Sequence, residues 1–333
     1  MNIKFSNSYL KFISSLFIYI IIFSCSSNRK KKLQSIEDSI NFQYEFIIKN
    51  DEYINQIKQS LPGKFIKLSK GFTYYELANP NTSNPTIVLI HGFSVPSYIW
   101  DPTFLKAKEL GYKVLRFDLF GRGYSQNPNL DYTDELFAKQ SWDLIDSLSI
   151  DKPILIGLSN GGRVISKMAN IYPNKIEKLI YVSSNGFNNV EEKSDKSVSQ
   201  KEILEFINNY DLLSKSQKND FKYPEKFQDW DKKYSELQKH KGFAKALIST
   251  LKNHESLDCI HEEISKTEIQ IYTIWGEYDK VVDYHSFEGK INKFFPNRRE
   301  YFLKSAGHLP HMESAEEFNA ILFDEILDFT YKN

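Results

Sequence analysis

The sequence has very little cysteine: its 333 residues contain only Cys25 and Cys259. Two thiols are too few for a disulfide framework, and neither lies in the kind of cysteine–histidine cluster that binds zinc. Basic and acidic residues balance at 43 each, so the formal net charge is zero and nothing points to a nucleic-acid surface. We therefore expect a fold stabilised by packing, with no metal, no cofactor and no nucleic-acid partner.

Long hydrophobic runs are scarce, and the longest is at the N-terminus. Lys4 and Lys11 precede an apolar run at 12–23, which Ser24 and Cys25 follow. A charged start, an apolar stretch and a small residue before the cut are typical of a secretory signal. The Ile-Phe-Ser-Cys end of this segment resembles the bacterial lipobox, in which the cysteine is lipidated and becomes the mature N-terminus.

We therefore expect a signal peptide at 1–24 and a chain that is exported and anchored by lipid at Cys25. The anchor would lie on the periplasmic or cell-surface side of a bacterial membrane. Ordinary signal cleavage and an uncleaved anchor are the alternatives, although the run of about 12 residues is short against the ~20 that a span needs. With Cys25 lipidated, Cys259 has no partner for an intramolecular disulfide.

Short β-branched or aromatic runs along the chain predict an α/β fold. From Thr86 onward helical stretches separate these runs, which implies a mostly parallel sheet with helices on both faces. The eight expected strands are 65–68, 73–77, 86–90, 113–119, 153–157, 178–183, 270–275 and 299–303. Such sheets bind ligands beyond the carboxyl ends of their strands.

The strand pattern stops at 188–266, where charged segments at helical spacing predict helices at 200–210 and 242–251. We interpret 188–266 as a helical cap inserted into a core formed by 61–187 and 267–333. Residues 25–60 are expected to form a tether and a short helix. The aromatic residues of the cap either line a pocket or pack its helices together, and packing is favoured for most of them: Tyr210, Phe221, Tyr223, Phe227, Trp230 and Tyr234.

A Gly-x-Ser-x-Gly segment lies between an apolar run at 153–156 and a helix-like stretch at 163–169. Gly157 and Gly161 flank Ser159 at positions where a Cβ would collide with the adjacent strand or helix. A sharp turn of this kind lifts the serine above the sheet, where the dipole of the next helix favours negative charge. Ser159 is our candidate nucleophile; the alternative is a structural serine that caps the helix.

A serine hydroxyl is a weak nucleophile and needs a histidine base and a carboxylate that orients it. Asp279 follows the expected strand at 270–275 and is our candidate for the acid, with Glu277 and Asp283 as competitors. Its position just past a strand end places it at the binding edge of the sheet.

His308 follows the last expected strand and is our candidate base, with His311 as the competitor. The two histidines have an i, i+3 spacing, but a proline intervenes and no His-Glu-x-x-His motif accompanies them, so we expect no metal there.

An acyl-transfer site also needs hydrogen-bond donors for the negative oxygen of the tetrahedral intermediate. His91, Gly92 and Phe93 directly follow the expected strand at 86–90. We expect the backbone N–H groups of Phe93 and Asn160 to be these donors. His91 is interpreted as a hydrogen-bond partner that shapes the loop.

In these motifs the chain resembles the α/β-hydrolase superfamily, specifically its capped, lipase- and esterase-like members. The likeness covers residues 64–333 and rests on segments in a fixed order: His-Gly-Phe at 91–93, Asp-x-x-Gly-x-Gly-x-Ser at 118–125, Gly-x-Ser-x-Gly at 157–161 and Trp-Gly-x-x-Asp at 275–279. The glycines of the second segment indicate a tight turn near the pocket.

The resemblance implies hydrolysis of a small carboxylic ester through an acyl-enzyme on Ser159, with medium-chain or monoacylglycerol-like esters as the expected substrates. Thioesterase, amidase or peptidase, and C–C bond hydrolase activities use the same machinery and stay open. A surface lipoprotein that binds without catalysis is the alternative from another class. Dehalogenases and epoxide hydrolases of the family use a carboxylate nucleophile, and position 159 is serine.

Overall fold

The computed structural model describes residues 26–43, 46–82, 85–191 and 193–327. The expected signal peptide and Cys25 lie outside these ranges. Within them, no helix combines the length and apolar character that a membrane crossing requires.

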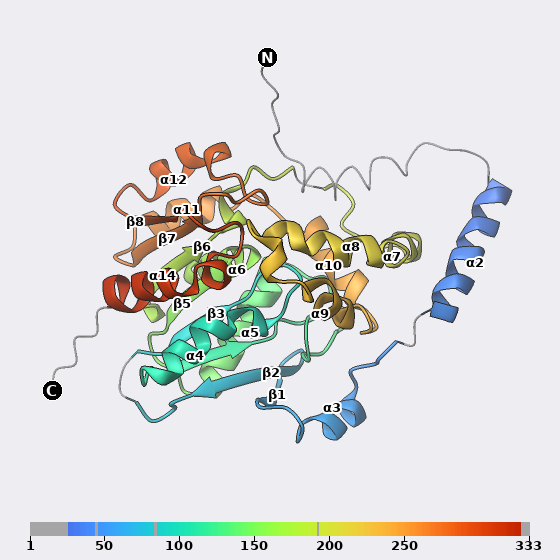
Figure 1. Cartoon of the computed structure of the whole chain (residues 1–333), viewed down its shortest axis with the longest axis horizontal. Coiled ribbons are helices and arrows are strands. Elements are labelled where there is room, and N and C mark those ends of the chain that lie inside the picture. The colour runs from blue at the N-terminus through green and yellow to red at the C-terminus, as the bar shows by residue number, and fades with distance from the viewer. Residues whose placement is uncertain (1–25, 44–45, 83–84, 192, 328–333) are drawn as a thin grey trace, which may run out of the picture.

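An eight-stranded sheet with the order β1-β2-β4-β3-β5-β6-β7-β8 forms the centre of the molecule (Figure 1). β2 pairs antiparallel with β1 and β4, and every other neighbouring pair is parallel. The mostly parallel sheet predicted from the sequence is thereby confirmed. The strands are β1 (Lys64–Leu68), β2 (Gly71–Ala78), β3 (Ile87–Ile90), β4 (Val114–Phe117), β5 (Ile154–Leu158), β6 (Lys178–Val182), β7 (Gln270–Gly276) and β8 (Arg299–Leu303).

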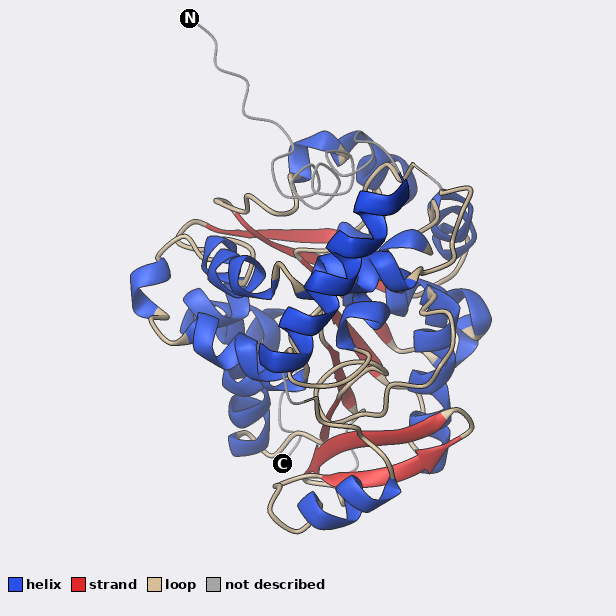
Figure 2. Cartoon of the chain, turned by 90° about the vertical axis from the view of Figure 1, so that its right-hand side faces the viewer, coloured by secondary structure: helices blue, strands red, loops and turns tan. Residues whose placement is uncertain are grey.

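Alternating side chains of the central strands build two hydrophobic cores, one on each face of the sheet. On β3, Ile87 and Leu89 belong to one core and Val88 and Ile90 to the other, and all are fully buried. Helices flank the strands on both sides (Figure 2). The first core includes residues of α4 (Asp101–Glu109), α14 (Ala315–Ala320) and the π-helical segment Ile321–Ile326, and the second includes residues of α5 (Asp134–Ser147), α6 (Asn160–Ile171), α11 (Asp258–Ser265) and α12 (Glu288–Phe294).

The cap lies between β6 and β7 and consists of short helices. They include α7 (Gln200–Ile207), α8 (Tyr210–Ser216), the 3₁₀ segment η4 (Gln217–Asp220), α9 (Trp230–Leu237) and α10 (Phe243–Lys252). The helix expected at 200–210 is therefore interrupted after Ile207. Cap aromatics pack on one another: Phe221 stacks on Phe227 with ring centroids 3.9 Å apart, and Trp230 meets Phe221 edge-on.

Residues 26–57 are more helical than the expected tether and short helix, because they contain α2 (Ser26–Gln43) and α3 (Asp51–Ile57). α2 lies beside α7 of the cap. Its apolar residues Leu33, Ile36 and Ile40 recur at helical spacing and join the first core. Charged neighbours concealed this pattern in the sequence.

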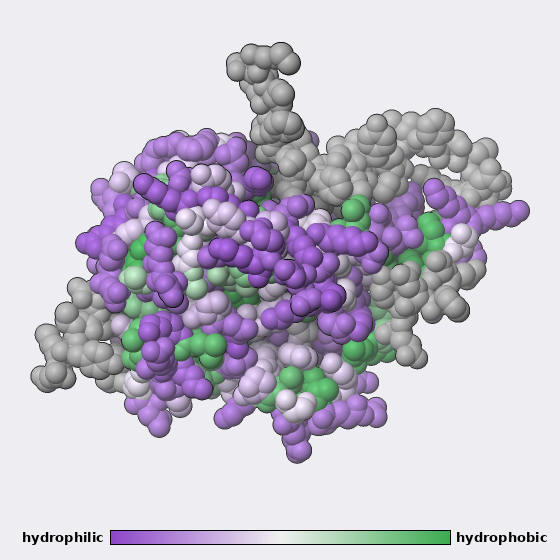
Figure 3. All heavy atoms as spheres, viewed as in Figure 1, coloured by the Kyte–Doolittle hydropathy of each residue, from purple (hydrophilic) through white to green (hydrophobic). Residues whose placement is uncertain are grey.

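The segment after α2 connects the cap to the core. The Ile47 N–H donates to the Lys239 carbonyl at 2.8 Å, and the Lys49 ammonium donates to the Gly123 carbonyl at 2.9 Å. Elsewhere, hydrophilic residues cover most of the face shown in Figure 3, and hydrophobic ones appear between them in separate patches.

Candidate active site

The backbone at Ser159 is strained. This residue joins β5 to α6 with φ 50° and ψ −114°, a region that non-glycine residues rarely occupy. A Cβ on Gly161 would lie 2.5 Å from the Ile90 carbonyl oxygen, and one on Gly157 would collide with the backbone of Gly161. The Ser159 N–H donates to the Val182 carbonyl at 2.8 Å, so the neighbouring strand holds the turn in place.

His308 and Asp279 are hydrogen-bonded as the sequence predicts. The Nδ1 of His308 lies 2.8 Å from Oδ2 of Asp279, and both side chains are buried. The other carboxylate oxygen of Asp279 accepts the N–H groups of Val281 and Val282 at 2.8 and 2.9 Å. Because Nδ1–H donates to Asp279, the unprotonated Nε2 of neutral His308 is left to accept a proton.

The competing candidates for the base and the acid have other surroundings. His311 is fully buried and its Nε2 lies 3.0 Å from the backbone oxygen of Ile99, to which it donates. Glu277 and Asp283 are exposed to solvent. Among the described residues, none of these three contacts the His308–Asp279 pair through a hydrogen bond or an ion pair.

Ser159 and His308 line one cavity of about 120 Å³ between the carboxyl ends of the strands and the cap. Its walls are mostly apolar, and the cap contributes Leu213, Asp220 and Tyr234. In the described part of the chain, no hydrogen bond joins the Ser159 hydroxyl to the His308 ring. Such bonds are often long before substrate binds, and the shared cavity keeps both groups within reach of one substrate.

The two expected oxyanion donors are available. Among the described residues, neither the Phe93 N–H nor the Asn160 N–H has a hydrogen-bond partner, and Phe93 lines the cavity. The His91 ring accepts the Leu119 N–H at Nε2, 2.9 Å away, and donates from Nδ1 to the Gly92 carbonyl, also at 2.9 Å. This second bond fixes the peptide plane that carries the Phe93 N–H. Burial lowers the pKa of His91 to about 3, so the ring stays neutral.

Arg122 is a residue of the site that the sequence interpretation missed. It lies inside the segment taken only as a tight turn, and it is 1% exposed. Its guanidinium donates to the Phe93 carbonyl at 2.8 Å, to the Phe120 carbonyl at 3.2 Å and to the Thr250 hydroxyl at 2.9 Å. Burial lowers the pKa of Arg122 to about 10, so it remains a cation at neutral pH.

Arg122 therefore joins the oxyanion loop, its own turn and cap helix α10. No carboxylate forms an ion pair with it within the described ranges; its guanidinium instead lies about 5.0 Å from the centre of the Phe137 ring. A buried cation without a counter-ion favours negative charge that develops nearby. A lone arginine between two glycines is the only sequence signal that marks this position.

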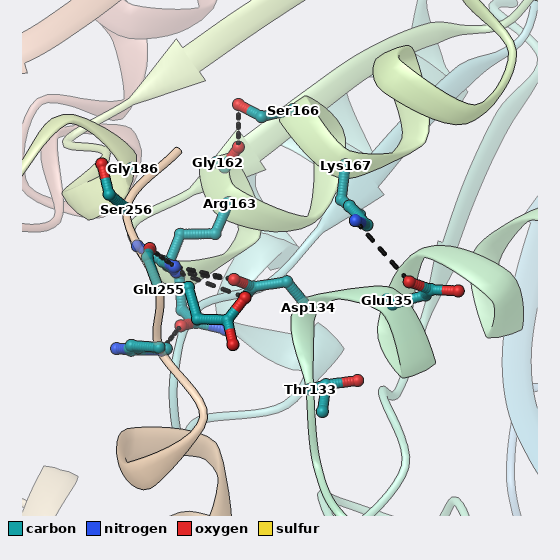
Figure 4. A network of polar contacts seen from close by, with 12 residues as sticks. Thr133, Asp134, Glu135, Gly162, Arg163, Ser166, Lys167, Gly186, Glu255 and Ser256 are labelled. Carbon is teal, nitrogen blue, oxygen red and sulfur yellow. Dashed lines mark hydrogen bonds and ion pairs between the residues drawn. The ribbon is translucent and has the colours of Figure 1, made fainter. Parts of the chain in front are cut away.

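A second buried arginine attaches the cap to the first turn of α6. Arg163 donates to Oδ2 of Asp134 at 2.7 Å and to the Glu255 carbonyl at 2.6 Å (Figure 4). Next to it, Nε2 of His254 lies 2.8 Å from Oδ1 of Asn160, the residue that follows the candidate nucleophile. The position of the turn thus depends on the α5 helix and on the cap. The described residues contain no cluster of His, Cys, Asp and Glu suited to hold a metal ion.

A family model described as alpha/beta hydrolase fold matches residues 85–315. The chain belongs to the α/β-hydrolase family. The crystal structure of the enol-lactonase from Burkholderia xenovorans LB400 has the same fold, with a TM-score of 0.65 and 19% identity over 78% of this chain and 98% of that one.

Two sequence relatives show how much of the chain the likeness covers. An uncharacterized protein of Mycobacterium tuberculosis is 35% identical over 104 residues, which are 31% of this chain and only 30% of that relative. The pimeloyl-[acyl-carrier protein] methyl ester esterase of Wigglesworthia glossinidia brevipalpis is 29% identical over 74% of this chain and 93% of its own length. Membership of the family indicates a hydrolase fold and does not identify the substrate.

The buried Arg163–Asp134 pair generates a prediction about stability. Asp134→Ala leaves Arg163 buried without its carboxylate, which typically costs about 3–5 kcal/mol. Equilibrium urea unfolding should show this loss. The matched control is Glu135→Ala, because Glu135 is the next residue, its carboxylate is half exposed and it pairs only with lysines. We expect Glu135→Ala to change the free energy of unfolding by less than about 1 kcal/mol. Equal losses in the two variants would contradict the assigned role of the buried pair.

Proposed function

We propose that the protein is a serine hydrolase that cleaves carboxylic esters through an acyl-enzyme on Ser159. One observation carries the proposal: a strained serine turn opens into the same cavity as a histidine that a buried carboxylate orients. Membership of the α/β-hydrolase family and the likeness to an esterase support it.

In the proposed reaction, Nε2 of His308 takes the proton of the Ser159 hydroxyl while Oγ attacks the ester carbonyl carbon. The imidazolium returns that proton to the leaving alcohol as the C–O bond breaks. A water molecule, deprotonated by the same ring, then attacks the carbonyl carbon of the acyl-enzyme. As the bond between that carbon and Oγ of Ser159 breaks and the acid leaves, the imidazolium returns the proton to Oγ. Asp279 keeps the ring in the required tautomer and stabilises its positive charge.

The negative oxygen of each tetrahedral intermediate would bind the N–H groups of Phe93 and Asn160. Because these donors have no other partner among the described residues, they need not break a bond within the protein before they stabilise the charge. His91 bonds to the Gly92 carbonyl, and Arg122 bonds to the Phe93 carbonyl. The peptide groups on both sides of Phe93 are thereby held in position.

The size of the cavity favours short substrates. A volume of about 120 Å³ is close to that of engineered cavities, roughly 150 Å³, that bind benzene. Medium-chain or monoacylglycerol-like esters, which the family resemblance suggested, would not fit wholly inside a cavity of this size. We therefore propose esters with short acyl groups as the preferred substrates.

Hydrolysis of p-nitrophenyl esters from acetate to palmitate tests the proposal directly. With a chain that begins at Ser26, we expect the highest kcat/KM at acetate to butyrate. Ser159→Ala should lower kcat by about 10³-fold or more, because it removes the nucleophile. Ser265→Ala, an exposed serine at the end of α11, serves as the control and should retain wild-type activity. Turnover that survives in Ser159→Ala, or an optimum at palmitate, would contradict the proposal.

The pH dependence of kcat/KM tests the base. Burial alone would lower the pKa of His308, but the charge and hydrogen bond of Asp279, with the charges of Asp220 and Glu313, outweigh it and raise the pKa above 6.5. Only the neutral ring accepts a proton, so activity should rise with pH through a midpoint above 6.5. A midpoint below 6.5, measured with p-nitrophenyl acetate, would be inconsistent with this environment.

We further propose that the chain is exported and lipid-anchored at Cys25, on the strength of the N-terminal sequence alone. Expression of the full chain in a bacterium fed an alkyne-bearing palmitate should label the protein. Cys25→Ser should abolish the label and Cys259→Ser should retain it. Label that persists in Cys25→Ser would refute the anchor.

A further inference from the structure

Asp220, the last residue of η4 in the cap, lines the catalytic cavity, and apart from the effect of its charge on the pKa of His308 it takes no part in the reaction described above. Its backbone carbonyl accepts the His308 N–H at 2.8 Å, which places the residue beside the candidate base. Among the described residues, its carboxylate has no hydrogen-bond donor and no ion-pair partner. Asp220 is partly exposed, and a carboxylate that faces a mostly apolar cavity without a donor is available to a ligand.

Of the charged groups around Asp220, only His308 offsets its charge, and only when the ring is protonated. Its titratable neighbours are His308, Asp279 and Glu313, and burial raises the pKa of Asp220 to about 7. No lysine or arginine is among the described residues that line the cavity. The nearby cation Arg122 lies behind the oxyanion loop, where its guanidinium is bonded to protein oxygens.

A second acceptor in the same cavity is also unsatisfied. Asn185 follows β6, lines the cavity, and its buried side-chain Oδ1 has no hydrogen-bond partner among the described residues. Most of the remaining wall is aliphatic, including Leu213, Leu251 and Val282. The buried hydroxyl of Tyr234, which also lines the cavity, has no partner among the described residues either. Asp220 is therefore the charged acceptor in a mostly apolar wall, and it suits a ligand that brings its own donor.

We infer that the cavity selects small esters that carry a hydroxyl or ammonium group and rejects esters that carry a carboxylate. This inference rests on the proposed esterase function and narrows its substrate class. A donor on the substrate satisfies the carboxylate of Asp220. A second carboxylate instead meets a like charge in a site without a cation.

Four ethyl esters of similar size test the selection: ethyl butyrate, ethyl 3-hydroxybutyrate, ethyl 3-aminopropanoate and monoethyl succinate. Their hydrolysis is followed at pH 8, where Asp220 is mostly ionised. For the wild type, we expect kcat/KM for the hydroxyl or the ammonium ester to exceed that of ethyl butyrate about tenfold or more. Monoethyl succinate should fall below ethyl butyrate by a similar factor.

The decisive quantity is the ratio of kcat/KM values between esters, because all four share the same catalytic steps. Asp220→Asn removes the charge at nearly constant volume and should reduce both the ammonium preference and the succinate rejection at least tenfold. Asp229→Asn, an exposed carboxylate elsewhere on the cap, should leave every ratio unchanged. Far-ultraviolet circular dichroism and the melting temperature verify that each variant is folded.

The outcomes separate the two proposals. A wild type that hydrolyses the esters without ranking them by charge contradicts the selection alone. Ratios that are the same in wild type and Asp220→Asn show that another group sets the preference and also overturn the inference. A wild type that hydrolyses none of the four esters contradicts the proposed function and, with it, the substrate class.

Discussion

The geometry of the candidate active site depends on the strained backbone at Ser159. An L-residue keeps φ 50° and ψ −114° only where its surroundings leave no alternative. Here the Val182 carbonyl of β6 fixes the N–H of the serine, and the glycines on both sides let β5, α6 and the Ile90 backbone approach closely. The parallel sheet thus fixes the position of the turn, and its hydrogen bond and close packing keep Ser159 in the strained conformation.

Hydrogen bonds of a few buried side chains join the cap to the candidate active site. Arg122 bonds to Phe93 in the oxyanion loop and to Thr250 in α10, and Arg163 bonds to α5 and to the backbone of Glu255. The bonds to Thr250 and Glu255 would be lost if the cap moved away. The arrangement of the oxyanion donors therefore depends on a docked cap, and the small cavity belongs to that state.

Much of the site could be predicted because its signals are local. Ser159 directly follows β5, and Asp279 and His308 lie in the loops just after β7 and β8. Parallel strands bring their carboxyl ends to one edge. Arg122, Asp220 and the Arg163–Asp134 pair could not be predicted, since their importance arises from partners far away in the sequence. The length of α2 was not predicted for a related reason: its apolar residues gain their significance only from the contact of this helix with α7.

The most direct test of the account is covalent labelling of the full chain with a fluorophosphonate, followed by mass spectrometry of the peptides. We expect a single adduct on Ser159, and labelling slowed about a hundredfold or more in His308→Ala because the base is missing. A well-folded protein whose Ser159 stays unmodified, or is modified equally fast without His308, would contradict the claim that this turn holds an activated nucleophile.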